Sequence, residues 1–175
     1  YNPYESLLIG ITEIIVYGGY RSIEPYYLLP MVPFLPIQTY LGDLDNDMIG
    51  FYISKEFQDI ITFYSSILID EWSPSYTFKR ENKNWMIYQF GLKKINTFND
   101  KDKFILEYTY SDNRVFLHRF PINNYYSYDY PIGFWAGPHS TNLYILYSII
   151  FDDIQINTSY SKSRRGELEL IQNEK

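Results

Sequence analysis

Short apolar runs separated by turn-forming residues make up most of this chain. Residues 7–17 are rich in β-branched side chains and stop at Gly18 and Gly19, which predicts a largely buried strand closed by a turn. Further strand-like runs cover residues 48–54, 60–70, 76–80, 85–95, 103–110, 114–120, 132–136 and 143–156. Many short strands separated by regular turns are typical of an antiparallel β-sandwich or jelly roll, so the pattern predicts an all-β fold.

One polar link gives the clearest hairpin signal in the chain. Ser111-Asp112-Asn113 separates the apolar runs 104–110 and 114–120. Asp and Asn favour tight turns because their side chains hydrogen-bond the nearby backbone and they tolerate left-handed conformations. The two runs are therefore predicted to pair as neighbouring antiparallel strands.

Residues 24–40 differ from the strand-like runs because they combine prolines with apolar side chains. The prolines are Pro25, Pro30, Pro33 and Pro36. They remove backbone donors, so the segment is predicted to be an extended arm that lies over a hydrophobic surface of its own domain or of a partner chain. The same prolines argue against a transmembrane segment. We expect three parts: residues 1–40 with the first strand and the arm, a sandwich domain over 41–160, and a polar tail over 161–175.

Composition supports a single β-rich domain and excludes several classes of protein. The chain has 175 residues, of which 46% are hydrophobic, and it contains 20 Tyr but no Cys. With Ala136 as the single alanine, an alanine-rich helical bundle is excluded. The formal charge of −6 disfavours binding to nucleic acid. The absence of cysteine excludes disulfides, cysteine-based zinc sites and thiol nucleophiles.

Several of the later segments resemble strands of the concanavalin A-like β-sandwich family, which includes L-type lectins and laminin-G-like domains. These segments are residues 47–54, 104–110 with 114–120, 130–137, 144–151 and 152–156, so the resemblance spans roughly residues 47–156. It implies a jelly-roll sandwich and carbohydrate binding as the function. In the lectins the first of these motifs places an aspartate at the sugar, and Asp47 occupies that position here.

An acidic turn precedes the second strand-like run. Asp43, Asp45 and Asp47 alternate with Leu44 and Asn46, so a turned backbone could direct three carboxylates at one cation. Calcium prefers oxygen ligands of this kind. Calcium is therefore the one cofactor that we expect, and an acidic solvated turn is the alternative.

Aromatic residues in or beside the predicted loops are the strongest binding signal. They include Trp72, Tyr125, Tyr126, Tyr128 and Trp135. Sugar rings stack their apolar faces on aromatic planes, and aromatic side chains are also enriched in protein interfaces. A glycan and a protein surface are therefore both candidate partners.

Three functions follow, in decreasing order of support. The first is a non-enzymatic recognition module that binds carbohydrate through loop aromatics with possible calcium support. The second is a structural subunit of a larger organellar, viral or bacterial assembly, with residues 24–40 and the Tyr-rich loop, residues 125–130, as interfaces. The third, a glycoside hydrolase, needs two facing carboxylates for which the sequence shows no motif.

We expect secretion or the cell surface, with an organelle or virion as the alternative location. A large apolar patch left open would favour the assembly.

Overall fold

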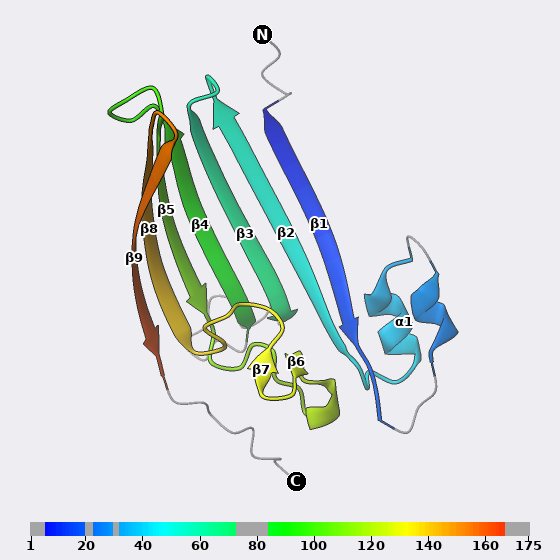
Figure 1. The fold of residues 1–175 in the computed structure, drawn as a ribbon. Coiled ribbons are helices and arrows are strands. Elements are labelled where there is room, and N and C mark those ends of the chain that lie inside the picture. Colours follow the sequence, from blue (N-terminus) through cyan, green and yellow to red (C-terminus); the bar gives the residue numbers. More distant parts are fainter. Residues whose placement is uncertain (1–5, 20–22, 30–31, 73–83, 167–175) are drawn as a thin grey trace.

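The computed structural model consists mainly of one antiparallel β-sheet (Figure 1). It describes residues 6–19, 23–29, 32–72 and 84–166. Seven strands lie in the order β1-β2-β3-β4-β5-β8-β9, and every neighbouring pair is antiparallel. Their bounds are β1 Leu7–Val16, β2 Asn46–Phe57, β3 Ile61–Glu71, β4 Trp85–Ile95, β5 Asp102–Ser111, β8 Ser140–Phe151 and β9 Ile154–Arg165.

The predicted all-β, antiparallel class is confirmed. The jelly-roll connectivity is not, because strands that are neighbours in the sheet are also successive along the chain, apart from one insertion between β5 and β8. That insertion contains a second, two-stranded sheet formed by β6 (Tyr126–Ser127) and β7 (Tyr130–Pro131), and a short 3-10 helix, Pro121–Asn123.

The hairpin predicted around Ser111-Asp112-Asn113 is wrong, since residues 114–120 form no strand of the large sheet. The strand predicted over residues 132–136 is also absent from the large sheet. Val115 and Phe116 are both fully buried, whereas consecutive residues of a strand point to opposite faces. Phe116 also has a positive φ of 71°, which breaks an extended backbone. The run predicted over 143–156 is divided into β8 and β9 by a turn at Asp152. The run predicted over 76–80 lies outside the described residues.

The proline-rich segment is helical where it is described, rather than extended. A 3-10 helix covers Pro25–Leu28 and α1 covers Phe34–Tyr40. The prolines Pro25 and Pro36 lie in the first turns of these helices, where backbone N–H groups have no intrahelical partner and none is lost. The segment lies beside the end of β1 (Figure 1), and the Leu35 amide donates a hydrogen bond to Glu13 at 3.1 Å.

The expected division into parts does not coincide with breaks in the sheet. Strand β1, from the expected first part, pairs with β2 along its whole length. Strand β9 continues through Arg165, past the expected start of the tail at residue 161.

The two ends of the sheet are built differently. At one end tight turns join the strands, as between β2 and β3, where Gln58 and Asp59 have positive φ and the Ile60 amide bonds the Phe57 carbonyl at 3.0 Å. The other end, which we call the base end, carries the helical segment and the β5–β8 insertion (Figure 1). Insertion and sheet share a small core there, formed by Met48, Ile87, Val115 and Phe116 with partly buried neighbours.

Asp102 fixes the turn between β4 and β5, and its removal should weaken the fold. Its buried carboxylate accepts hydrogen bonds from the amides of Thr97, Phe98 and Asn99 and from the Tyr147 hydroxyl at 2.9 Å. Burial alone would raise its pKa, but these hydrogen bonds together lower it.

We expect Asp102→Asn to lower the urea midpoint of unfolding at about pH 7, because the amide nitrogen cannot accept these bonds. The wild-type advantage is present above the unfolded pKa of about 4 and is lost as the pH falls through the lowered folded-state pKa. The exposed Asp100→Asn is the matched control. A midpoint for Asp102→Asn equal to that of the control would contradict this role.

Candidate functional site

A cavity of about 450 Å³ lies at the base end beside β2 and β3. Its lining combines acidic, aromatic and aliphatic side chains from the helical segment, three strands and the insertion. The residues are Leu35, Gln38, Asp43, Asp45, Asn46, Asp47, Ile49, Phe51, Ile69, Asp70, Glu71, Trp72, Trp85, His118 and Arg119. Four predicted site residues, Asp43, Asp45, Asp47 and Trp72, therefore meet in one cavity.

The ladder between β3 and β4 ends irregularly at this cavity. Its register shifts between Ile69 and Glu71, so Asp70 lies in a bulge. Asp70 is buried, and one of its carboxylate oxygens accepts a hydrogen bond from the Phe116 amide at 2.6 Å. This contact ties the β5–β8 insertion to β3, on the face of the sheet opposite Ile69.

Asp47 has an unusual electrostatic environment. Burial, and to a lesser extent repulsion from Glu13, raise the pKa of its carboxyl to about 7, and the Met48 amide has a smaller opposite effect. Both carboxylate oxygens are inaccessible to solvent, and neither has a hydrogen-bond donor of normal geometry within the described part of the chain. Glu71 is affected similarly, since desolvation and then Asp43 raise its pKa while Arg119 lowers it.

The other two predicted metal ligands have structural partners. Asp45 is fully buried and accepts a hydrogen bond from the Tyr27 hydroxyl at 2.5 Å. Asp43 lies 3.6 Å from the Arg119 guanidinium, which also donates to the Asp43 backbone carbonyl. Across the described ranges, no group of three or more carboxylate or histidine side chains is arranged to hold a metal ion.

Two indole rings line the cavity. Trp72 follows β3 and is 58% exposed. Trp85 opens β4, is half-buried, and has the Arg114 guanidinium 5.9 Å from its ring centre. His118 is also half-buried, and burial is the main cause that lowers its pKa.

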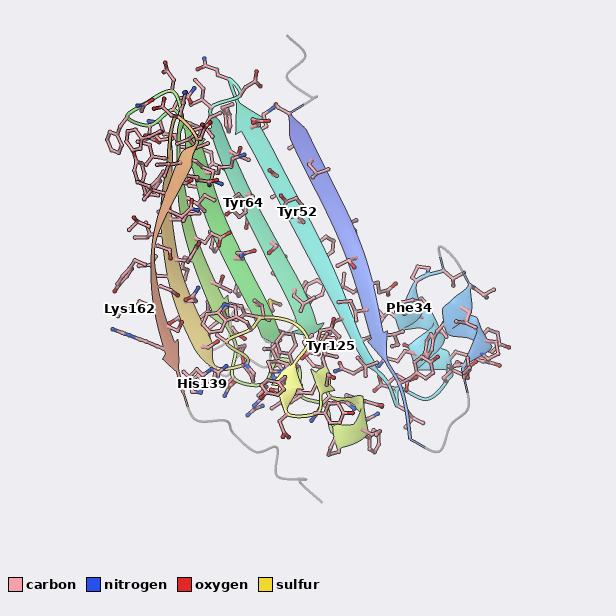
Figure 2. The ribbon with its side chains drawn as sticks, in the orientation of Figure 1. Phe34, Tyr52, Tyr64, Tyr125, His139 and Lys162 are labelled. Carbon is pink, nitrogen blue, oxygen red and sulfur yellow. The ribbon has the colours of Figure 1, made fainter. Side chains whose placement is uncertain are left out.

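The remaining predicted aromatics lie away from this cavity. Tyr125 and Tyr126 pack against the core at the base end, where Figure 2 labels Tyr125. Tyr128 is 97% exposed. Trp135 lines a separate, shallow hollow with Glu107, Asn142, Tyr144 and Ser161. This hollow lies on the face of the sheet opposite the one that carries Asp47 and Ile69. The structure therefore divides the five predicted sugar-binding aromatics among four places.

Sequence reasoning missed the parts of the cavity that come from distant segments. Gln38 was expected in an extended arm, yet its side-chain amide bonds the Asp45 carbonyl at 2.6 Å. Arg119 was expected in a strand and instead reaches Asp43 from the insertion. No local motif marks either residue, because each acts through a contact that depends on the tertiary fold.

Comparison with known proteins identifies no relative: no family model, curated protein or solved structure matches this chain. The resemblance to concanavalin A-like sandwiches stays a prediction. Within the described residues, no helix is long and apolar enough to cross a membrane.

Asp70 should make the stability of the fold depend on pH. Burial is the main cause that raises its pKa to about 8, so the folded state binds a proton that the unfolded chain releases near pH 4. The free energy of unfolding should therefore decrease as the pH rises from about 4 to about 8, by roughly a few kcal/mol.

Asp70→Asn keeps an oxygen acceptor for the Phe116 amide without the charge. We expect its stability to change less over this pH range than that of the wild type, as measured by urea unfolding at several pH values. The exposed Asp129→Asn should retain the wild-type slope. Parallel slopes for Asp70→Asn and wild type would show that the carboxyl is ionised in the folded chain.

Proposed function

We propose that this chain is a structural β-sheet component of a larger assembly, in which neighbours cover one face of its sheet. The observation that carries this proposal is a broad apolar surface, which we call the apolar face. It contains Ile9, Ile11, Phe51, Ile53, Phe63, Ile67, Phe90, Leu92, Leu106, Tyr108, Leu143 and Ile145, which the strand register places on one side of the sheet.

The opposite face has a different composition. Across the same strands it carries more small and polar residues than the apolar face does, among them Gly10, Thr12, Ser54, Ser66, Gln89 and Thr109. Figure 2 shows two of its larger side chains, Tyr52 and Tyr64, over the middle of the sheet, and the Tyr64 hydroxyl donates to Glu107. A more apolar face opposite a more polar one is typical of an antiparallel sheet with one buried face.

The chain does not bury this face itself. Ile11 is 72% exposed and Phe90 56% exposed, although both lie within long strands. Of the large hydrophobic residues in the described part, thirty-four are exposed, against seven hydrophobic residues that are buried. Removing one such side chain from water contributes about 1.5–3 kcal/mol, so covering the face would stabilise the fold substantially.

The two segments expected as interfaces support the same proposal. In the helical segment, Leu28 and Tyr40 are 67% and 81% exposed. In the Tyr-rich loop, Tyr130 is 76% exposed. These side chains add exposed apolar surface outside the sheet and would give neighbours additional points of contact.

The proposal predicts that the purified chain self-associates or requires detergent. Replacing Ile11, Phe51 and Phe90 together by Ser should reduce association and the binding of a fluorescent apolar dye, as measured by light scattering and dye titration. The matched control replaces Thr12, Ser66 and Gln89 on the opposite face by Ala, which should leave association unchanged. A monodisperse wild-type monomer that does not bind the dye would contradict the proposal.

Carbohydrate recognition is a second candidate function, and the cavity is the observation that favours it. Trp72 and Asp47 line one cavity, so an indole plane for stacking lies close to carboxylate and amide groups that can bond sugar hydroxyls. Calcium support from Asp43, Asp45 and Asp47 remains part of this proposal, and added calcium is one arm of its test.

Trp72→Ala should abolish glycan binding measured on an array with and without calcium, because the loss of a stacking plane costs about 1–3 kcal/mol. Tyr128→Ala removes an exposed aromatic outside the cavity and should bind as the wild type does. Equal loss in both variants, or a blank array for the wild-type chain, would count against a sugar site in this cavity.

A further inference from the structure

We propose that two copies of this chain pair edge to edge through β1, so that their two sheets join into one. The contact is made by residues 7–12, which we call the open edge. This inference rests on the proposed structural role and names one neighbour in the assembly. The geometry that points to it is an uncharged edge whose outward hydrogen-bonding groups and side chains fit a second copy of the same edge.

Strand β1 is one of the two edges of the sheet. Among the described strands it pairs with β2 alone, and Figure 1 shows it at one margin of the sheet. The helical segment lies beside its base end, where the Leu35 amide bonds Glu13 and residues 13–16 are partly buried. In the open edge, Ile9 and Ile11 are 64% and 72% exposed. An added strand therefore has access to residues 7–12 of β1.

The backbone of the open edge points alternate hydrogen-bonding groups away from the sheet. The Glu56 amide donates to the Ser6 carbonyl at 2.9 Å, so these two residues form a hydrogen-bonded pair that continues the β1–β2 register. Such pairs recur at every second residue of an antiparallel ladder. Leu7, Ile9 and Ile11 lie at the positions between them. Their N–H and C=O groups therefore point outward, where a further strand can bond them.

A two-fold axis at Ile9, perpendicular to the sheet, matches the outward groups of two copies. It makes the two edges antiparallel, with Ile9 opposite Ile9 of the second copy and Leu7 opposite its Ile11. Every outward group of these residues then meets an outward group of the other edge. Opposite residues lie on the same face, so large aliphatic side chains meet on the apolar face. On the other face Leu8 lies opposite Gly10.

A hollow beside Gly10 suits the leucine that this pairing brings to it. The hollow has a volume of about 310 Å³ and is lined by residues of β1, β2 and β3, including Gly10, Thr12, Gly50 and Leu68. Leu8 of the second copy would form a closely spaced pair with Gly10, with Cα atoms about 4.5 Å apart. Because Gly10 has no side chain, Leu8 can lie over the hollow. Leu8 is 60% exposed in the single chain, so the contact removes apolar surface from water.

The opposite edge of the sheet is a poorer partner for β1. The seven strands alternate in direction, so β1 and β9 run the same way. A second copy with its apolar face on the same side would therefore pair β1 with β9 in parallel, which is the less stable arrangement. Strand β9 also carries Lys162, Arg164 and Arg165, and charged side chains protect an exposed edge from pairing. The open edge has no acid to compensate them.

Cysteine crosslinking of the full chain tests which residues meet, because the chain has no cysteine of its own. In the proposed pair the Cα atoms of the two Ile9 residues lie about 5.5 Å apart, within the range of a disulfide. Ile9→Cys should therefore give a disulfide-linked dimer on a non-reducing gel after mild oxidation. Leu7→Cys and Ile11→Cys should each stay uncrosslinked alone and crosslink when mixed. Phe90→Cys, on a central strand of the apolar face, is the control for random collision.

Charge reversal at the two-fold axis gives a second readout. Ile9→Lys and Ile9→Glu each place like charges opposite each other, so each should weaken dimer formation about tenfold or more, as measured by sedimentation velocity. An equimolar mixture of the two variants should restore it, because Lys then faces Glu. Ile53→Lys and Ile53→Glu are the matched pair on β2, directly beside Ile9 on the same face, and mixing them should restore nothing. Circular dichroism checks that each variant is folded.

The outcomes separate this inference from the structural role on which it rests. Crosslinking of Ile9→Cys no greater than that of Phe90→Cys, in a chain that still associates, overturns the edge pairing and leaves the structural role standing. A monomeric wild-type chain with no crosslink in any variant overturns both. Crosslinking of Leu7→Cys or Ile11→Cys alone would overturn the two-fold axis at Ile9. Restoration by the mixed Ile9 variants, together with the Ile9→Cys dimer, supports the pairing.

Discussion

The alternation of side chains across one continuous hydrogen-bonded ladder is the constraint on which the rest of this structure depends. One row across the sheet contains Ile11, Phe51, Ile67, Tyr88 and Tyr110. A register slip by one residue in any strand would turn its apolar set to the opposite face, so the pairing fixes which face is apolar. A single layer cannot bury both faces, and in the described residues much of the apolar face is exposed to solvent.

The β5–β8 insertion determines where the small core of the chain lies. It covers the base end of the polar face, where Phe116 packs against strand residues such as Met48. Gly133 allows this packing, because a side-chain carbon at that position would lie 2.3 Å from the Phe116 ring. The backbone amide of Phe116 in the insertion donates a hydrogen bond to the Asp70 carboxylate. Asp70 also lines the cavity, so this one residue connects the core to the cavity.

Local patterns predicted the strands well and their arrangement poorly. Strand β4 has the predicted bounds, 85–95, because the apolar residues Tyr88, Phe90 and Leu92 alternate there with Gln89, Gly91 and Lys93, which is the period of a strand. The same logic failed at residues 114–120, where an equally apolar run packs as an irregular loop with Phe116 at positive φ. Asp47 and Trp72 were predicted on separate grounds, but their meeting in one cavity depends on the sheet register and on the insertion, which no local signal reports.

The acidic residues at the base end divide into two groups by what their oxygens contact. Asp45 and Asp70 are buried with donors from the helical segment and the insertion, so their contacts connect those segments to the sheet. Asp47 and Glu71 have raised pKa values without an equivalent structural contact in the described residues, which means that the fold bears an electrostatic cost at these two positions. Carboxyl groups with raised pKa values are more frequent at functional sites, because a group that binds a ligand does not also have all of its hydrogen-bonding partners within the protein. The division therefore separates Asp45 and Asp70, whose contacts hold the base end together, from Asp47 and Glu71, whose carboxyl groups have no such contact in the described residues.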